Sequence, residues 1–282
     1  MKQIVYLNGE FCDLADAKIS VLDRGFIFGD GIYEVIPVYQ GKLFRARQHL
    51  ARLARSLAYV GIANSYSEAE WLDLIQQLLA RQPEGDQMVY LQVTRGVAKR
   101  AHAFPKDVTP TIFMMSNPLP QVPAALRAAG VACVSMDDLR WLRCQIKSTS
   151  LLGNVLAAEY AAEHEAMESI QFRDGYLTEA SSSNVWLVKD GVLYAPPKDN
   201  LILEGIRYGL FEELCTQVGI TLVQKKLTKA EVLAADELLL SSATKEVLAV
   251  VKVDDQTIGN GQPGPIYHSL YAAYQAAKAA AT

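Results

Sequence analysis

Lys147 lies in the stretch RCQIKSTSLLGN, residues 143–154, between Ile146 and a run of small hydroxyl residues. A lysine amine attacks a carbonyl only when its ammonium form is destabilised, either by desolvation or by a neighbouring cation. If residues 141–147 form a strand, the apolar residues share one face and Lys147 lies on the other. That second face would be turned toward either solvent or a polar cavity. Position alone favours an ordinary solvated lysine, and a reactive amine is the alternative.

Two further stretches place polar or flexible residues where a bound group could approach the backbone. Glu179 is followed by an alanine and three serines in YLTEASSSNVW, residues 176–186, which suits an anion, a flat ring or an ordinary polar loop. In LILEGIRYGLFEEL, residues 201–214, the chain is predicted to pass from a strand through Gly205 into a helix. A helix N-terminus binds phosphate readily, although an ordinary glycine turn explains the pattern equally well.

A basic segment, VTRGVAKRAHAFP at residues 93–105, stands out in a protein of acidic composition. It carries Arg95, Lys99, Arg100 and His102. Because Arg100 and His102 are two positions apart, their side chains would point to the same side of an extended chain. The segment is therefore either a trap for a carboxylate or a solvated loop.

Composition disfavours several classes of function. The 282 residues are 50% hydrophobic and 21% charged, which is typical of a globular protein. The formal net charge of −4 disfavours a nucleic-acid binder, because phosphate contacts need a basic surface. We see neither a signal-peptide pattern nor an apolar run of about 18 residues, so we expect no membrane partner. The cysteines form no C-x-x-C pair and the histidines lack metal-ligand spacing, which predicts free thiols in a reducing cytoplasm and no metal site.

The elements that must position these residues are mixed strands and helices. Asn-Gly at 8–9 and Gln-Gly at 40–41 lie between apolar segments and predict hairpins. Residues 67–70 and 228–231 match capping boxes that open helices. Further strands are predicted over residues 88–96, 111–116, 130–136, 236–242 and 247–253, and further helices over residues 50–60, 151–166 and from 266 onward.

The segment NPLPQVP, residues 117–123, contains three prolines and cannot continue a central strand. It predicts a linker between an N-terminal α+β domain, residues 1–116, and a C-terminal α+β domain, residues 124–282, which carries Lys147. Pockets often lie at such junctions, so the junction is where we expect a bound group.

Six motifs together resemble the class IV aminotransferases, which are fold-type IV pyridoxal phosphate enzymes, and among these the D-amino-acid aminotransferases most closely. The motifs follow the family's order over most of the chain: DRGFIFGDGIYEV (23–35), QHLARL (48–53), VTRGVAKRAHAFP (93–105), RWLRCQIKSTSLLGN (140–154), LTEASSSNVW (177–186) and LILEGIR (201–207). The resemblance implies a two-domain α+β fold with pyridoxal 5'-phosphate between the domains.

The resemblance also assigns roles to single residues. Lys147 matches the lysine that forms a Schiff base with the cofactor and then moves protons at the substrate Cα. Glu179 matches the carboxylate that faces the pyridine nitrogen and keeps it protonated, so that the ring accepts electrons. The other implied cofactor ligands are Arg52 for the phosphate, Ile206 and Arg207 as a backbone cup for it, Thr244 as a hydroxyl donor, and Leu203 against the ring face.

Tyr33, Arg100 and His102 match the residues that hold the substrate α-carboxylate in the D-specific enzymes. The last two would reach in from the partner subunit of a homodimer. Charge-assisted bonds to a desolvated carboxylate are strong, and they decide which Cα–H faces the lysine. The implied reaction is a ping-pong transamination in which a D-amino acid such as D-alanine gives its amine to 2-oxoglutarate or pyruvate.

The sequence departs from the family at four positions. Ala180 stands where glycine is usual, and Arg207 stands where a hydroxyl residue is common. Tyr208 replaces a basic residue, and Ala243 replaces a frequent threonine. These changes affect the expected phosphate contacts rather than the chemistry, and Arg207 could compensate for them electrostatically.

Three alternatives share the fold or the cofactor. A branched-chain L-amino-acid aminotransferase would use the same Lys147 and Glu179, and an aminodeoxychorismate lyase would use them for elimination. A non-catalytic carrier of pyridoxal phosphate would need the lysine but no carboxylate trap. The R-x-H pattern at residues 100–102 favours the D-amino-acid series over the branched-chain enzyme and the carrier. The lyase is the remaining alternative.

Overall fold

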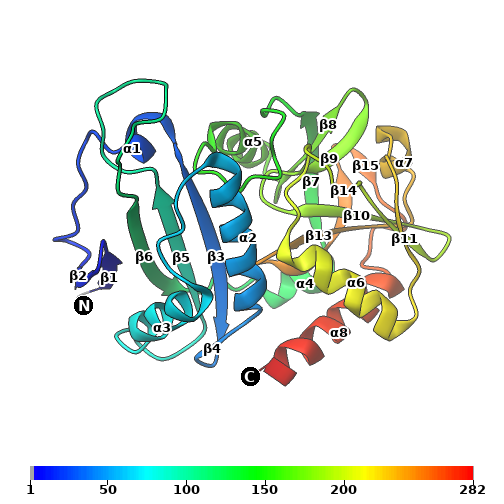
Figure 1. Ribbon diagram of the computed structural model, residues 1–282. Helices are drawn as coiled ribbons and strands as arrows, with labels where there is room; N and C mark the ends of the chain where they lie inside the picture. Colours follow the sequence, from blue (N-terminus) through cyan, green and yellow to red (C-terminus); the bar gives the residue numbers. More distant parts are fainter. Residues whose placement is uncertain (1–2, 282) are drawn as a thin grey trace. The chain divides into compact units, whose positions relative to one another are not determined.

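The computed structural model describes residues 3–281, which divide into two compact units (Figure 1). The first contains the chain up to Leu119 together with Ile146–Leu151, and the second contains Pro120–Gln145 and Leu152–Ala280. The division falls inside the proline-rich segment 117–123. The segment that carries Lys147, which the sequence assigned to the C-terminal domain, packs instead with the first unit, because its backbone bonds to a strand there.

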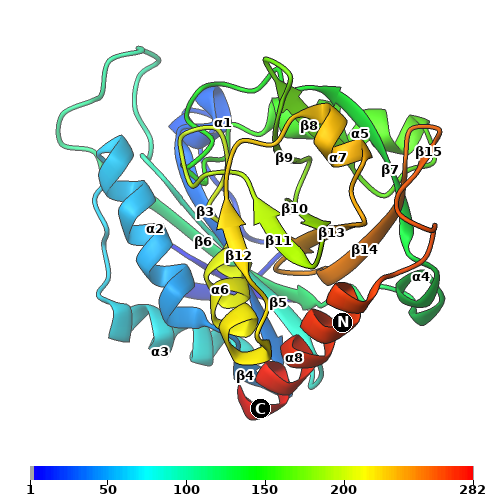
Figure 2. The ribbon, with the colours of Figure 1, turned by 90° about the vertical axis from the view of Figure 1, so that its right-hand side faces the viewer.

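The first unit is built on an antiparallel sheet with helices on one face. Its elements are β1 (Ile4–Leu7), β2 (Glu10–Asp13), α1 (Arg24–Phe28), β3 (Gly31–Tyr39), β4 (Lys42–Leu43), α2 (Ala46–Val60), α3 (Glu68–Leu79), β5 (Gln87–Thr94) and β6 (Thr111–Pro118). The strands pair in the order β2-β1-β6-β5-β3-β4. Helices α2 and α3 cover one face of this sheet (Figures 1 and 2), where Leu53 and Trp71 share an apolar core with Ile36 and Leu91.

Two hairpins of the first unit form where the sequence predicts them. Asn8 and Gly9 take φ values of 50° and 102° between β1 and β2. Gln40 and Gly41 take φ values of 49° and 77° between β3 and β4. Positive φ at both central residues is what a tight hairpin needs, so glycine and asparagine are suited to these positions.

The second unit holds a larger mixed sheet. Its elements are α4 (Ala124–Ala129), β7 (Val131–Asp137), α5 (Leu152–Glu163), β8 (Ser169–Arg173), β9 (Tyr176–Ala180), β10 (Asn184–Lys189), β11 (Val192–Ala195), α6 (Ile206–Val218), β12 (Leu222–Gln224), α7 (Lys229–Leu233), β13 (Glu237–Ser242), β14 (Glu246–Val253), β15 (Gln256–Thr257) and α8 (Pro265–Ala281). The strand order is β12-β11-β10-β13-β14-β7-β8-β9, with β15 beside β14. Leu238, Leu240 and Leu248 of the sheet share a core with Val232 of α7, while α6 stacks Phe211 on Trp186 of β10.

Some local predictions are confirmed and others are wrong. Both capping boxes form, with Ser67 at the start of α3 and Thr228 at the start of α7. The strand considered for residues 141–147 does not form, and that segment is irregular. The strand expected before Gly205 is also absent, although α6 does begin directly after this glycine. Among residues 3–281, no helix is both long and apolar enough to cross a membrane.

Candidate active site

Lys147 is held against β3 by backbone hydrogen bonds. Tyr33 N donates to the carbonyl oxygen of Lys147 over 3.0 Å, and Thr149 N donates to the carbonyl oxygen of Gly31 over 2.9 Å. The half-buried side chain of Lys147 places Nζ 4.2 Å from the centre of the Tyr33 ring. The ring covers one side of the amine and displaces part of the water around it. Two residues predicted to act together are thus neighbours in the first unit.

Glu34 follows Tyr33 in β3, so its side chain lies on the opposite face of the sheet, toward α2. Its buried carboxylate accepts from Arg52 Nε over 2.7 Å and from Nη2 over 2.8 Å, and it lies 2.8 Å from His49 Nδ1. Burial alone would raise the pKa of Glu34, but Arg52 and His49 outweigh it and hold this pKa well below its usual value. The orientation of Arg52, the predicted phosphate ligand, is therefore fixed by a carboxylate.

Arg100 and His102 lie on the exposed loop between β5 and β6. The loop is irregular rather than extended, so strand alternation does not place the two side chains. They nevertheless meet at one ring: the guanidinium carbon of Arg100 lies 5.4 Å from the centre of Phe28, and the His102 ring lies 5.6 Å from it. The first unit thus brings together both members of the predicted carboxylate trap.

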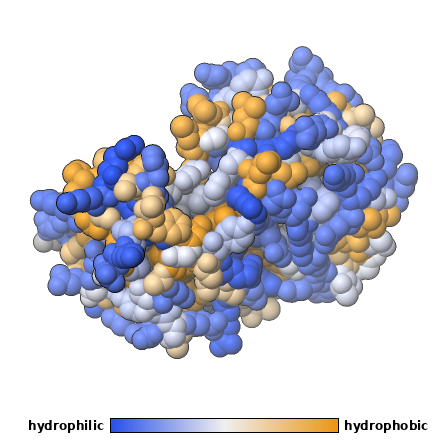
Figure 3. Space-filling view, turned by 45° about the horizontal axis from the view of Figure 1, so that its top comes forward, coloured by the Kyte–Doolittle hydropathy of each residue, from blue (hydrophilic) through white to orange (hydrophobic). Residues whose placement is uncertain are grey.

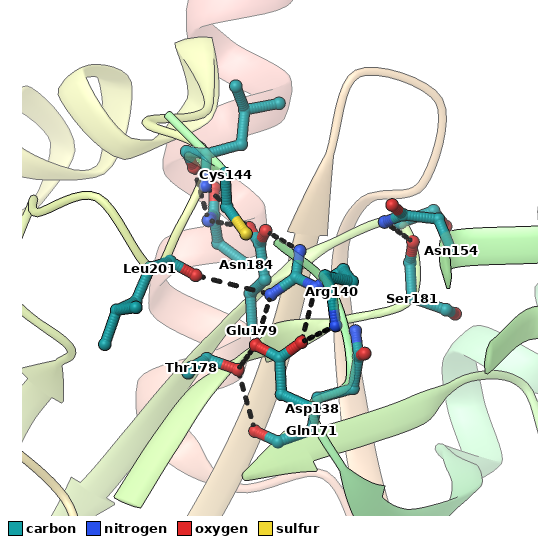
Figure 4. Close-up of polar contacts among 12 residues, drawn as sticks. Asp138, Arg140, Cys144, Asn154, Gln171, Thr178, Glu179, Ser181, Asn184 and Leu201 are labelled. Carbon is teal, nitrogen blue, oxygen red and sulfur yellow. Dashed lines mark hydrogen bonds and ion pairs between the residues drawn. The ribbon is translucent and has the colours of Figure 1, made fainter. Parts of the chain in front are cut away.

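Glu179 is a buried carboxylate at the end of β9 in the second unit (Figure 4). One of its oxygens accepts a short hydrogen bond from Arg140 Nη1. The other accepts from the backbone N–H of Leu203 over 3.0 Å and from Asn184 Nδ2 over 3.3 Å. Burial, the largest influence, raises the pKa of Glu179, and Arg140 and the Leu203 N–H act in the opposite direction. Two residues predicted to contact the cofactor, Glu179 and Leu203, are therefore joined by a hydrogen bond from the Leu203 backbone to the Glu179 side chain.

Arg140 is itself fixed by Asp138, as Figure 4 shows. Arg140 Nε and Nη2 donate to the two oxygens of Asp138, each over 2.9 Å. Burial would raise the pKa of Asp138, but Arg140 outweighs it and lowers this pKa to about 2. Arg173 also lies 3.1 Å from Asp138. Two cations and two carboxylates therefore balance in the interior, which buried charges require.

Asn184 links Glu179 to the segment before α6. Besides contacting Glu179, its Nδ2 donates to the carbonyl oxygen of Leu203 over 2.9 Å. A Cβ on Gly205 would lie 2.2 Å from the Asn184 Oδ1, so this position needs a glycine. The glycine that sequence analysis connected only with a helix start is therefore needed for close packing beside Glu179.

The start of α6 and the turn that carries Thr244 are joined by Arg207. Arg207 is buried and donates from Nη2 to the carbonyl oxygen of Ala243 over 3.3 Å, while its guanidinium lies 5.6 Å from the Tyr274 ring. Ile206 begins the helix, and Gly205 provides no side-chain cap for its first amides. The Arg207 side chain thus links the start of α6 to the turn that carries Thr244.

A second buried carboxylate, Glu168, orders the serine loop that follows Glu179. It accepts from Ser181 Oγ over 3.0 Å and from Ser182 N over 2.7 Å, and it makes a short hydrogen bond with Ser183. Lys245, next to Thr244, lies 2.7 Å from the same carboxylate. This cluster fixes the serine loop and the Thr244 turn to each other.

Several residues with buried side chains in these networks were not predicted from the sequence, among them Glu34, His49, Asp138, Arg140, Glu168 and Asn184. Arg140 lies in the same motif as Lys147, and Asp138 precedes Arg140 by two positions. This pair of opposite charges is a local signal that could have drawn attention to Arg140. Among residues 3–281, no group of His, Cys, Asp or Glu side chains is arranged to hold a metal ion.

We predict that Glu34→Gln lowers the free energy of unfolding by about 3–5 kcal/mol, because it leaves the buried Arg52 and His49 without their counter-charge. Denaturant titration at neutral pH measures this change. Glu68→Gln, which removes an exposed partner of Arg47, is the matched control and should leave stability nearly unchanged. An equal effect of the two substitutions would contradict the assignment.

The ion pair between Glu34 and Arg52 also predicts how the free energy of unfolding depends on pH. Because the pKa of Glu34 is lower in the folded protein, its contribution to stability is complete above its ordinary pKa of about 4.3 and is lost as the pH falls below that value. The Glu34→Gln protein should therefore lose less stability than the unmodified protein between neutral and acidic pH.

Comparisons with known proteins identify the family of this chain. Residues 31–253 match the family described as Amino-transferase class IV. The chain is 42% identical over 271 residues to D-alanine aminotransferase of Bacillus licheniformis. This match covers 96% of this chain and 95% of that protein. It is 41% identical over 272 residues to D-alanine aminotransferase of Staphylococcus aureus, with 96% of each chain covered.

Its fold is similar to that of the branched-chain amino acid aminotransferase of Escherichia coli, with a TM-score of 0.93, 23% identity, and coverage of 98% of this chain and 94% of that one. The family match covers most of the chain and includes Lys147, Glu179 and the start of α6. The chain therefore belongs to the class IV aminotransferases.

Proposed function

We propose that this protein is a pyridoxal-phosphate-dependent aminotransferase that moves the amine of a D-amino acid, such as D-alanine, to a 2-oxo acid. The relatives named D-alanine aminotransferase, which are about as long as this chain, support the reaction. The observation that carries the proposal is Lys147, whose backbone is fixed to β3 and whose amine lies over Tyr33. A lysine so placed is suited to bind a carbonyl and to move a proton.

The donor set fits pyridoxal 5'-phosphate. In the second unit, the uncapped amides at the start of α6 and the hydroxyl of Thr244 are groups that would suit a dianionic phosphate. In the first unit, the fixed guanidinium of Arg52 is a group of the same kind. Glu179 offers a buried carboxylate to a ring nitrogen, and Leu203 offers an apolar side chain to a ring face. When bound, the cofactor supplies a ring that accepts the electrons released at the substrate Cα.

The protein's own residues carry out the proton transfer and the orientation. Lys147 Nζ would take the proton from the Cα of the donor amino acid and, in the second half-reaction, deliver a proton to the Cα of the product amino acid. A positioned base of this kind is worth about 10²–10⁴-fold in rate. Tyr33, Arg100 and His102 would hold the α-carboxylate and so decide which Cα–H faces Lys147. Fixing the substrate in a reactive geometry within reach of the base adds a further rate contribution.

We propose that the active form is a homodimer. Leu152, Val155 and Leu156 occupy one side of α5 at helical spacing and are 72%, 58% and 61% exposed. Phe26 and Phe104 of the first unit are also exposed, and Figure 3 shows hydrophobic patches among hydrophilic side chains on one face of the molecule. Large exposed apolar side chains in groups are typical of surfaces that associate.

The dimer has a direct test. Sedimentation at micromolar concentration should give a dimer, and the double substitution Val155→Glu with Leu156→Glu should shift it toward monomer because it places charges in the interface. Val218→Glu on α6, where an exposed apolar residue is replaced in the same way, is the control and should remain dimeric. A monomeric unmodified protein with full activity would refute the proposal.

A cytoplasmic location is also proposed. Cys12, Cys133, Cys144 and Cys215 all lie within the described residues and are free. Unbridged thiols are typical of a reducing compartment, which supports this location.

A branched-chain L-amino-acid aminotransferase is the second candidate. It is suggested by the fold similarity to the Escherichia coli enzyme, but at 23% identity this similarity supports only a shared fold and no shared substrate. An aminodeoxychorismate lyase has no comparable support. The higher identity to D-alanine aminotransferases, together with Arg100 and His102 on one loop, favours the D series.

Matched enantiomers separate these candidates. With 2-oxoglutarate as the acceptor, initial rates should favour D-alanine over L-alanine by on the order of 100-fold or more, because a misplaced Cα–H costs about that much. D- and L-leucine should show the same preference. A preference for L-leucine would support the branched-chain enzyme, and pyruvate release from aminodeoxychorismate would support the lyase.

Lys147 is tested by covalent labelling and by substitution. Borohydride reduction of the cofactor-loaded protein, followed by peptide mass spectrometry, should place the cofactor on Lys147. Lys147→Arg keeps a cation over Tyr33 but cannot form the link, so it should lose the visible absorbance and at least about 10²-fold in rate. Lys106→Arg, on an exposed lysine, is the control. Label on any other lysine would overturn the assignment.

A further inference from the structure

The β5–β6 loop carries Arg100 and His102, yet residues 99–104 are all exposed and contain no regular secondary structure. An exposed loop is a poor support for side chains that must meet a substrate at a fixed angle, because its ordering costs conformational entropy. The first unit therefore needs a device that holds the loop. Two buried arginines provide one.

Arg24, in α1, is 3% exposed and reaches the loop backbone. Its Nη1 donates to the carbonyl oxygen of Ala101 over 2.6 Å, and its Nη2 donates to that of His102 over 3.4 Å. Its guanidinium carbon also lies 4.8 Å from the centre of Phe28, the ring that Arg100 and His102 contact. Arg24 thus bonds to the backbone on which the predicted carboxylate ligands stand.

Arg95, directly after β5, holds the loop from its other side. Its Nη2 donates to the carbonyl oxygen of Val60 over 2.8 Å, and its Nη1 donates to that of Gly61 over 2.9 Å. Its guanidinium carbon lies 3.6 Å from the centre of the Phe104 ring. These contacts connect the loop to the end of α2.

Asp30 ties the two arginines together. Arg24 Nε and Arg95 Nε donate to the same oxygen of Asp30 over 2.7 Å and 2.8 Å, and Arg95 Nη2 donates to the other oxygen over 3.0 Å. Burial would raise the pKa of Asp30, but the two guanidinium groups outweigh it and lower this pKa. Charge-assisted bonds among planar groups of this kind have narrow geometry, so the three side chains fix one another.

We propose that Arg24, Asp30 and Arg95, here called the Asp30 clamp, are positioning residues that hold the β5–β6 loop so that Arg100 and His102 meet the substrate carboxylate in one orientation. The inference rests on the proposed function of Arg100 and His102. The clamp does not contact the reacting atoms. It acts on substrate binding and on the choice of enantiomer through the loop backbone.

The clamp predicts a specific kinetic pattern. Arg24→Met removes the bonds to Ala101 and His102, so KM for D-alanine should rise about tenfold, as expected for losing a charge-assisted bond, while kcat changes by about twofold or less. The preference for D- over L-alanine should fall. Arg24→Lys keeps the charge but offers no fork of donors, and it should show an intermediate KM.

Hydrogen–deuterium exchange of the cofactor-loaded protein supplies a readout that does not depend on activity. Amides of residues 98–104 should exchange about tenfold faster in Arg24→Met than in the unmodified protein, while amides of β3 and α2 should be unchanged. Lys106→Met removes a positive charge from an exposed position on the same loop and is the matched control. It should change neither exchange nor KM. If Arg24→Met does not fold, Arg24→Lys carries the same comparison.

Arg100→Met separates failure of this inference from failure of the proposed function. A raised KM for Arg100→Met with unchanged KM in both Arg24 variants would overturn the clamp and leave the carboxylate assignment intact. An unchanged KM for Arg100→Met would refute that assignment, and exchange in the Arg24 variants would then decide the clamp alone. Unchanged exchange in both Arg24 variants overturns the clamp in every case.

Discussion

The proposed chemistry depends on a buried carboxylate, Glu179, that stays charged. Burial favours the neutral acid form of Glu179, but every polar partner of its two oxygens is a donor: Arg140, Asn184 and the N–H of Leu203. A proton on either oxygen would face one of these donors and remove a bond. We infer that the charged form prevails, and that Asp138 serves to hold Arg140 in the orientation this requires.

The same principle recurs in the first unit. Glu34 fixes Arg52, and Asp30 fixes Arg24 and Arg95, so these three arginines are oriented by carboxylates to which we assign no step of the reaction. Buried ion pairs of this kind add little net stability, because desolvation offsets their attraction. Their value lies in geometry, since a fixed guanidinium presents its donors in one plane.

Much of the local structure could be predicted from neighbouring residues. The hairpin at Asn8-Gly9 and the capping box at Ser67 need only a few adjacent positions, and both are confirmed. The networks could not be predicted in this way, because their partners are distant in sequence: 39 positions separate Arg140 from Glu179, and 77 separate Arg24 from Ala101. The family resemblance supplied Lys147 and Glu179, but it assigned no role to the residues that orient them.

The central claim is that Glu179 is charged. The most direct test is to measure its ionisation state in the cofactor-loaded protein by carbon-13 NMR of labelled glutamate at neutral pH. The account predicts a carboxylate in the unmodified protein and a neutral acid in Arg140→Met, where burial acts without its counter-charge. A protonated Glu179 in the unmodified protein, or a charged one that survives the loss of Arg140, would contradict it.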